Sequence, residues 1–459
     1  MKKSVFLIFF SILVLVATTL QSSAVLYVPE TEDAKIFYMI SLDDGTVISE
    51  HNAAQHAAPA SITKIVTAIL TIENCADLEE VVTVPAYCIR LLDGTNSSTA
   101  GIIPEEQLTV RQLLYCLLVS SANDAANILA DYVGKGSIEN FVNMMNEFVA
   151  GLGCENTHFA NAHGLDDPNH YTTAKDLAVI YSYCLQNSLF AEITGTFTYE
   201  IPPTNAYNDT RYLRNTNSLL NAGIPDYYFS YAKTGKTGTT DAAGRCLIST
   251  AVKDGYNYLC IVMNAKMYDC DDDGVDENMA FMLTKQLYEW AFDNVRLREV
   301  ANPNVFVGYE VQVRLSKEYD YVSLVPAESI SALVPVNVGT ESVYYEPYPD
   351  QTAVVVDAPV KKGDILGRAA IKYSGETIAE VDLVAAFDVN RSTTKYIGSI
   401  IMKIVRSTFF KVIAVFVFVV FLPGFILFFV IYPRKRRSKK NSIKMVDVKR
   451  MDKNQRRKG

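Results

Sequence analysis

The chain has 459 residues, of which 49% are hydrophobic, and its formal net charge is −9. This length allows two or three domains, each with a sizeable core. The charge is uneven, because residues 433–459 carry 13 Lys and Arg against 2 acidic residues, whereas the rest of the chain carries 29 against 49. An acidic body with a basic tail argues against nucleic acid as a partner.

The N-terminus has the pattern of a secretory signal. Two lysines precede an apolar run over residues 5–16, and small residues follow as far as Ala24. A charged start, a short apolar stretch and a small-residue site are typical of a cleaved signal peptide. We therefore predict that residues 1–24 are a signal peptide; an uncleaved anchor helix is the alternative.

The next elements are a hairpin and a helix. Residues 36–50 alternate around the turn signal Asp43-Asp44-Gly45. Apolar residues then recur at helical spacing from Ser61, two residues after a proline. Lys64 lies three residues further on and shares its face, where a buried amine could act as a base for the hydroxyl. Taken alone, S-x-x-K is common by chance, and an ordinary amphipathic helix is the alternative.

The rest of this region alternates between helical and strand patterns. Helices are predicted over residues 110–119, 124–132, 137–152, 174–185 and 278–292, and strands over 245–252 and 256–264. Thr109 is the predicted N-cap of the first of these helices. Ser121-Ala122-Asn123 is predicted on a helix–helix turn. Helices before and after the strands indicate an α/β (α+β) sandwich around a central antiparallel sheet, which we place in a domain over residues 30–296.

Short β patterns separated by turn residues follow and predict a small all-β domain over residues 302–387. The expected strands are 305–307, 309–315, 322–325, 336–338, 343–345, 353–356 and 378–386.

The C-terminal end has the pattern of a membrane anchor. Apolar residues form one stripe over 395–411, as in a helix that lies on a membrane surface. Residues 412–432 carry no charge and are long enough to span a bilayer. The basic segment 433–459 then predicts a cytoplasmic tail. We expect a single-pass cell-membrane protein, anchored at its C-terminal end, with its body on the extracytoplasmic face.

No metal or cofactor is expected. The eight cysteines form no C-x-x-C pair, which gives a zinc site no support, and the sequence leaves disulfides open. The run 269–274 resembles the start of a calcium-binding loop, but position 12 would be Ala280, where a bidentate Glu is required. A solvated acidic turn is the favoured interpretation. No nucleotide-phosphate loop or metalloprotease motif is present.

Three motifs stand in one chain: Ser61-x-x-Lys64, Ser121-x-Asn123 and Lys236-Thr237-Gly238. Together they resemble the D-alanyl-D-alanine carboxypeptidases of peptidase family S11, the low-molecular-mass penicillin-binding proteins. The resemblance covers the whole predicted secreted body and includes His163-Gly164-Leu165 and Asn215-Thr216-Asn217. It implies a β-lactamase/transpeptidase-like domain, followed by the all-β domain and the C-terminal transmembrane helix.

The resemblance implies the following catalytic roles. Ser61 is the nucleophile that attacks the terminal D-Ala-D-Ala bond, and Lys64 is its base. Ser121 relays a proton toward the leaving amine, and Asn123 orients Lys64 and the substrate amide. Acyl transfer needs such a nucleophile and proton path, together with donors aimed at the developing oxyanion.

The third motif is implied to bind the substrate. Lys236 supplies a fixed positive charge, Thr237 meets the terminal carboxylate, and Gly238 leaves room for the substrate backbone. The backbone N–H of Thr239 joins that of Ser61 in the oxyanion hole. A second KTG triplet begins at Lys233, but only the triplet at Lys236 matches the family spacing to Thr240 and Ala243-Gly244.

One departure concerns the substrate carboxylate. The family commonly carries an arginine at the head of the last helix, where this chain reads Asn278-Met279. The carboxylate is then held by Lys236, Thr237 and Thr239 alone, or by a nearby cation such as Lys266. His163 is either a base for deacylation or, as we favour, a structural residue.

The predicted function is a serine-type carboxypeptidase that removes the terminal D-Ala from the peptidoglycan pentapeptide, a stem peptide ending in D-Ala-D-Ala, through an acyl-enzyme on Ser61. It is expected to be acylated by β-lactams and to need no cofactor. One alternative is a β-lactamase of the same fold, although the loop 166–170 lacks a clear counterpart of the glutamate that such enzymes use for deacylation. The other is a non-catalytic protein that binds penicillin or peptidoglycan.

Overall fold

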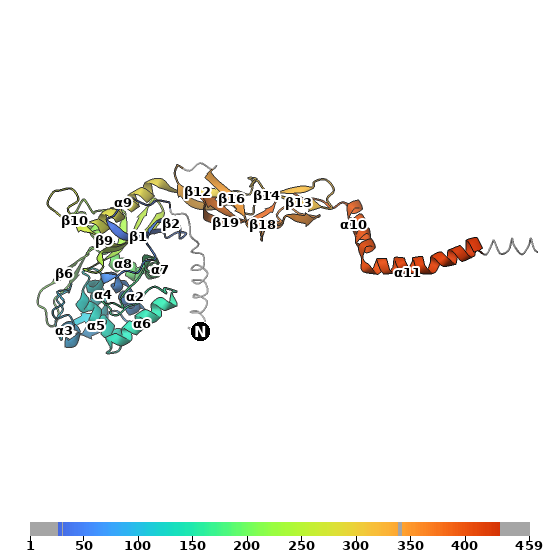
Figure 1. The fold of residues 1–459 in the computed structure, drawn as a ribbon. Helices are drawn as coiled ribbons and strands as arrows, with labels where there is room; N and C mark the ends of the chain where they lie inside the picture. The colour runs from blue at the N-terminus through green and yellow to red at the C-terminus, as the bar shows by residue number, and fades with distance from the viewer. Residues whose placement is uncertain (1–25, 30, 338–341, 432–459) are drawn as a thin grey trace, which may run out of the picture. The chain divides into compact units, whose positions relative to one another are not determined.

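The structure is a computed structural model, and it describes residues 26–29, 31–337 and 342–431 (Figure 1). The predicted signal peptide, residues 1–24, and the predicted basic tail, residues 433–459, lie outside the described residues.

A five-stranded antiparallel sheet organises the first part of the chain. Its strands run in the order β2-β1-β9-β8-β7, which leaves β7 at one edge. Their bounds are β1 Ala34–Ser41, β2 Val47–His51, β7 Ala232–Thr240, β8 Gly244–Lys253 and β9 Tyr256–Ala265. The predicted hairpin and the two predicted strands after residue 244 are confirmed, and so is the mixed α/β fold with a central antiparallel sheet.

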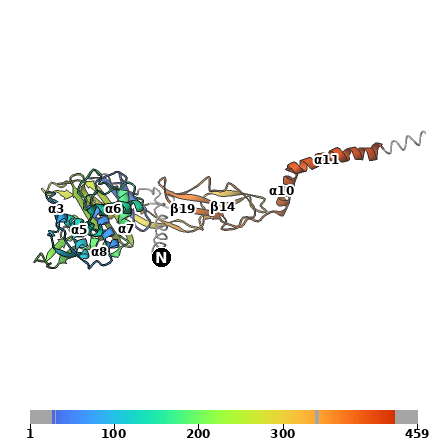
Figure 2. The ribbon, with the colours of Figure 1, turned by 90° about the horizontal axis from the view of Figure 1, so that it is seen from below.

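Helices cover both faces of this sheet, and the alternation of side chains along β1 explains why. Ile36 and Tyr38 pack into one core with the larger helical layer, whereas Phe37 and Met39 pack into a second core against α9. Figures 1 and 2 show the larger layer on one side of the sheet. The helices are α2 Lys64–Asn74, α3 Ala86–Arg90, α4 Val110–Leu118, α5 Asn123–Val133, α6 Ile138–Gly151, α7 Ala174–Cys184, α8 Ser188–Gly195 and α9 Met279–Asn294.

Local capping explains where several helices begin. The Thr109 side chain accepts from the backbone of Gln112, and the Gln112 side chain accepts from the backbone of Thr109, so the predicted N-cap is confirmed as a full capping box. The hydroxyl groups of Ser137 and Thr173 cap α6 and α7 by accepting from the backbone three residues further on, without a reciprocal side-chain bond.

Short strand pairs were not predicted from the sequence. They are β3 Val81–Thr83 with β4 Gln107–Thr109, β5 Thr198–Ile201 with β6 Arg211–Arg214, and β10 Met267–Tyr268 with β11 Glu277–Asn278. Two 3₁₀ turns, η1 Ala60–Thr63 and η2 Ser218–Leu220, lie in the same part of the chain. Such short elements carry too little periodicity to predict.

The all-β region contains strands that the sequence analysis partly missed. Its strands are β12 Val295–Ala301, β13 Glu310–Arg314, β14 Tyr321–Pro326, β15 Ile330–Pro335, β16 Val343–Pro347, β17 Val355–Asp357, β18 Ile365–Tyr373 and β19 Glu376–Ala385. Strand β12 pairs with β15, and the other six form a sheet in the order β16-β18-β19-β14-β13-β17. The expected strand at residues 305–307 is wrong, because the chain there is irregular. The strand expected over residues 336–338 is wrong at residues 336 and 337, which form a turn after β15, and residue 338 lies outside the described residues.

The chain divides into two compact units, and the division is not a single cut at the expected residue 302. The first unit extends to Asn302 and also includes Glu328–Pro347 and Ala369–Val381. The second contains Pro303–Ala327, Tyr348–Arg368 and the described residues from Asp382 to Ile431. The boundary therefore falls within strands β18 and β19. All residues of the predicted active site belong to the first unit.

Two exposed helices follow the β strands. Helix α10, Thr393–Arg406, overlaps the predicted amphipathic segment, and α11, Thr408–Phe425, continues into a π-helical stretch, η4 Ile426–Ile431. By length and composition, α11 is the one helix of the described residues that could cross a membrane, which is weak evidence on its own.

Candidate active site

The predicted nucleophile lies on a tightly constrained turn. Ala60 has φ +48°, a left-handed conformation that non-glycine residues rarely adopt. The Thr63 hydroxyl donates to the Ala60 carbonyl at 2.8 Å. Gly164 is packed so closely on the same carbonyl that a Cβ there would lie 1.9 Å from its oxygen. These contacts fix the backbone immediately before Ser61.

Ser61 and Lys64 are in direct contact. Lys64 Nζ lies 2.8 Å from Ser61 Oγ and 2.6 Å from the carbonyl oxygen of His163. The Lys64 side chain is fully buried, and burial lowers its pKa well below the ordinary 10.5. The neighbouring charge of Lys236 lowers the pKa further, while Asp124 opposes the shift. A lowered pKa favours the neutral amine, the form that can accept the proton of an adjacent hydroxyl.

A second hydroxyl–lysine pair lies beside the first. Ser121, with φ +61°, occupies the turn between α4 and α5, as predicted. Lys236 Nζ donates to Ser121 Oγ at 2.8 Å and to the Thr237 carbonyl at 2.8 Å. Lys236 is fully buried, which lowers its pKa to about 7. Burial therefore disfavours the charged form of Lys236, the residue predicted to supply a fixed positive charge.

Asn123 contributes a buried acceptor. Its side chain is 3% exposed, and its backbone N–H donates to the Ser98 carbonyl at 2.8 Å. Within the described chain, Asn123 Oδ1 has no hydrogen-bond partner. An unsatisfied buried acceptor costs about 1–3 kcal/mol, so this oxygen is suited to accept an N–H from a bound ligand.

The third motif borders the nucleophile turn along the edge strand β7. A Cβ at Gly238 would lie 2.9 Å from the Pro59 carbonyl oxygen and 3.2 Å from the Ser61 nitrogen. Gly238 is therefore needed for the protein's own packing, a reason that the sequence analysis did not give. Thr237 is half-buried and shares a 2.6 Å hydrogen bond with the Thr216 hydroxyl, and Thr239 is exposed.

Comparison with known proteins identifies the family of this chain. Residues 23–267 match the family model described as D-alanyl-D-alanine carboxypeptidase, peptidase S11. The chain belongs to this family. The predicted enzyme class, a serine peptidase of the penicillin-binding protein fold, is thereby confirmed. Residues 304–391 also match the C-terminal domain of penicillin-binding protein 5, in the predicted all-β region.

Individual relatives are distant in sequence but extensive in coverage. D-alanyl-D-alanine carboxypeptidase DacF of Bacillus subtilis is 28% identical over 78% of this chain and 87% of its own length. DacC of Escherichia coli is 28% identical over 78% and 84%. The crystal structure of the Streptomyces K15 DD-transpeptidase is 28% identical, with a TM-score of 0.52, and covers 58% of this chain and all of that one.

The loop that contains His163 and Asp166, between the second and third motifs, contacts the site at two places. His163 touches Lys64 through its carbonyl, while its Nδ1 accepts from the Leu165 N–H at 3.2 Å. Burial lowers the pKa of His163 to about 3, so its ring is neutral at neutral pH. These contacts support the structural interpretation of His163. Asp166 accepts a 2.6 Å hydrogen bond from the Thr240 hydroxyl on β7.

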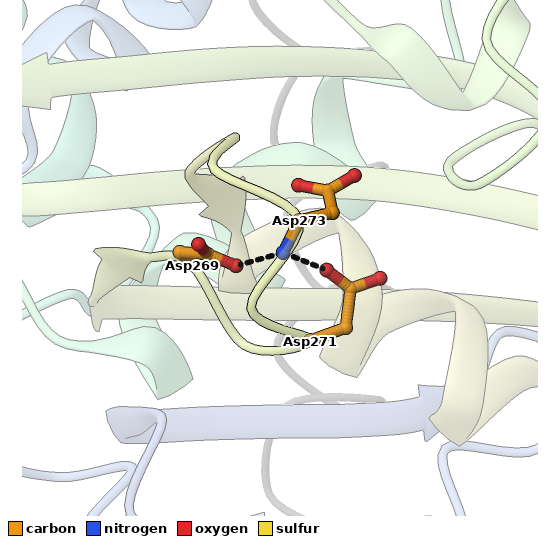
Figure 3. Close-up of side chains that lie close together, drawn as sticks. All are labelled: Asp269, Asp271 and Asp273. Atoms are coloured by element: carbon orange, nitrogen blue, oxygen red, sulfur yellow. Dashed lines mark hydrogen bonds between the residues drawn. The ribbon is translucent and has the colours of Figure 1, made fainter.

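Two features lie away from this arrangement. Lys233, in the first KTG triplet, is exposed, whereas Lys236 is the lysine beside Ser121. Asp269, Asp271 and Asp273 form an acidic loop whose carboxylates accept from backbone N–H groups of the same loop (Figure 3). Their carboxylate oxygens lie within 4.8 Å of one another, and the solvated acidic turn favoured from the sequence stays a prediction. All eight cysteines are free thiols.

Several residues of the site were not singled out from the sequence. The sequence analysis named Thr216 only within Asn215-Thr216-Asn217. The side chains of both flanking asparagines bond backbone groups, so a threonine between two asparagines is the sequence signal that could have identified it. Thr63 and His170 form another such contact, with Thr63 Oγ1 2.7 Å from His170 Nε2. No sequence pattern connects these two residues, which are 107 positions apart.

Proposed function

We propose that this protein is a membrane-anchored serine carboxypeptidase that removes the terminal D-Ala from peptidoglycan stem peptides through an acyl-enzyme on Ser61. The observation that carries this proposal is the 2.8 Å contact between Ser61 Oγ and the fully buried Lys64 Nζ. Membership of the D-alanyl-D-alanine carboxypeptidase family supports the substrate class.

In acylation, neutral Lys64 takes the proton from Ser61 Oγ as this oxygen attacks the carbonyl carbon of the penultimate D-Ala. The N–H groups of Ser61 and Thr239 stabilise the oxyanion. The proton then passes through Ser121 to the nitrogen of the terminal D-Ala as the C–N bond breaks. The products are free D-Ala and an ester on Ser61.

In deacylation, a water molecule attacks the ester carbonyl and gives its proton to the amine of Lys64. The ester C–O bond breaks, Ser61 regains its proton, and the shortened peptide leaves with a new carboxylate. The chain therefore needs no external oxidant, reductant or cofactor for this cycle. Asn123 holds the substrate amide through the acceptor that lacks a partner in the ligand-free protein.

β-Lactams enter the same first step, because their strained ring amide takes the place of the scissile bond. Ring opening leaves the amine attached to the acyl group, so the leaving group remains in the site and slows hydrolysis. We propose that penicillins therefore acylate Ser61 and inhibit the enzyme.

We also propose that the enzyme works at the extracytoplasmic face of the cell membrane. Its supports are the apolar helix α11, the exposed amphipathic helix α10 and the basic tail that the sequence places after them. The charge asymmetry favours a cytoplasmic tail and an external body.

The test compares wild type with Ser61→Ala, and uses Ser230→Ala as a control because Ser230 is exposed and belongs to none of the three motifs. Labelled penicillin and release of D-Ala from diacetyl-Lys-D-Ala-D-Ala are measured in parallel. Wild type and Ser230→Ala should label and release D-Ala, while Ser61→Ala should do neither. Covalent labelling of Ser61→Ala would overturn the assignment.

The same assays separate the alternatives. Rapid and repeated hydrolysis of nitrocefin would indicate a β-lactamase. Penicillin labelling without D-Ala release would indicate a binding protein.

A further inference from the structure

The proposed substrate ends in a carboxylate, and this group needs a permanent positive charge near Thr237 and Thr239. Lys236 is poorly suited to supply it alone. Its amine is buried and donates to Ser121 and to the Thr237 carbonyl, and its pKa is lowered to about 7. The head of α9 offers Asn278 and Met279 in place of a cation.

The register of the sheet brings an arginine to this place. Arg245 on β8 is the direct partner of Thr239 on β7. Two residues away on each strand, Thr237 pairs with Leu247. Partners across antiparallel strands have side chains on the same face, with Cβ atoms about 5 Å apart, and diagonal neighbours are about 7–8 Å apart. Arg245 therefore shares a face with Thr239 and, diagonally, with Thr237. Lys236 points to the opposite face, toward the nucleophile.

The guanidinium of Arg245 has a weak hydrogen-bond partner that a ligand could replace. Its Nη2 lies 2.8 Å from Met267 Sδ, and Arg245 is half-buried. In the described parts of the chain it forms no ion pair with a carboxylate. A thioether is a weak acceptor, so a carboxylate would replace it with a much stronger, charge-assisted and bidentate partner.

The contact with Met267 also locates the guanidinium. Met267 is the direct strand partner of Asn278, the N-cap of α9. A positive charge therefore lies beside the head of α9, supplied from strand β8 and not from the helix itself. Lys266, the cation considered from the sequence, is exposed and precedes Met267.

We propose that Arg245 binds the terminal carboxylate of the substrate, together with Thr237 and Thr239, and so restricts the enzyme to peptides with a free C-terminal carboxylate. This inference rests on the proposed carboxypeptidase function. The same group would hold the carboxylate of a penicillin. On binding, Arg245 leaves Met267 and turns toward β7.

The experiment uses the full-length protein with Arg245→Gln and Arg245→Lys. Lys266→Gln tests the rival cation named from the sequence, and Lys175→Gln, which removes an exposed lysine paired with Glu50, is the control. kcat/KM is measured for diacetyl-Lys-D-Ala-D-Ala and for the same peptide with a C-terminal amide. Acylation rates by benzylpenicillin and by its methyl ester supply a second acid-to-neutral ratio. Melting temperatures check folding, and Arg245→Lys keeps the charge if the glutamine variant is unstable.

Arg245→Gln should lower the rates on the two acids by about 10- to 100-fold and leave the rates on the amide and the ester nearly unchanged. Arg245→Lys should lie between it and wild type, because lysine keeps the charge and loses the bidentate geometry. Lys175→Gln should match wild type, and Lys266→Gln should show no selective loss on the acids. Equal losses on acid and neutral compounds, no loss on either, or a selective loss in Lys266→Gln would overturn the role of Arg245. If wild type itself releases no D-Ala, the proposed function fails instead.

Discussion

The two faces of the central sheet differ in how deeply they bury positively charged side chains. On the nucleophile face, Lys64 and Lys236 are fully buried, and burial lowers the pKa of each. On the other face, Arg245 is partly open to solvent beside a methionine. A guanidinium stays charged at every pH that the protein meets, whereas an amine changes its protonation when buried. The face that we propose for proton transfer therefore carries lysines, and the face that we propose for recognition carries arginine.

Removing the amine on the nucleophile face should have the largest effect. Lys64→Met keeps a similar apolar length and removes the base, so acylation by labelled penicillin should slow by about 10³-fold, within the range for general-base catalysis. Lys175→Met, which removes an exposed lysine paired with Glu50, is the control and should label normally. A loss in Lys64→Met of less than about tenfold would mean that another group takes the proton.

Lys236→Met should slow acylation by about 10²-fold and should also change how stability depends on pH. The pKa of Lys236 is about 7 in the folded protein and 10.5 in the unfolded chain. Between these values the unfolded chain binds more protons, so the penalty of burying Lys236 is complete below pH 7 and lost as the pH rises toward 10.5.

The melting temperature of Lys236→Met relative to wild type should therefore be higher at pH 7 than at pH 10. Lys233→Met removes the exposed lysine of the neighbouring triplet and should change neither the rate nor this difference. A pH-independent difference for Lys236→Met would contradict the lowered pKa.

Gly238→Ala tests the packing between β7 and the nucleophile turn. The added Cβ would press on the Pro59 carbonyl and the Ser61 nitrogen, at a cost of about 1–3 kcal/mol, and should slow acylation about tenfold. Gly151→Ala, in α6, meets nothing within 4 Å and should be neutral or stabilising by up to about 1 kcal/mol. Chemical denaturation measures both, and equal behaviour of the two variants would count against the close approach.

The smallest expected effect concerns the support of Ala60. The Ala160 N–H donates to His170 Nδ1, so Nε2 carries the proton and donates to the Thr63 hydroxyl, which in turn donates to the Ala60 carbonyl. Thr63→Val should slow acylation by a few-fold, whereas Thr63→Ser should retain the wild-type rate. If the two variants behave alike, the hydroxyl has no positioning role.

The same histidine gives a pH signature. Burial lowers the pKa of His170 from 6.5 to about 4, so the unfolded chain binds more protons between these values. Stability should fall as the pH decreases from 6.5 to 4, and less steeply in His170→Gln. Melting temperatures across this range measure the slope.

The sequence was sufficient for much of the fold and for the motif residues, since helical periodicity, capping signals and three motifs with their neighbours are local properties. It did not show that Gly238 packs on Pro59, that Arg245 lies opposite Thr239, or that His170 supports Ala60 through Thr63. These contacts depend on strand register and on the meeting of distant loops, which no local pattern encodes. Strands β12 and β18 were missed because their side chains mix polar and apolar residues without regular alternation.

The pH dependence of acylation tests the central claim, that burial prepares Lys64 to act as a neutral base. We expect the second-order rate constant for labelled penicillin to be near its maximum around neutral pH and to fall on acidification, as the amine takes up a proton. A rate that climbs about tenfold per pH unit from pH 7 to pH 10 would instead indicate a lysine with an ordinary pKa and would contradict the account.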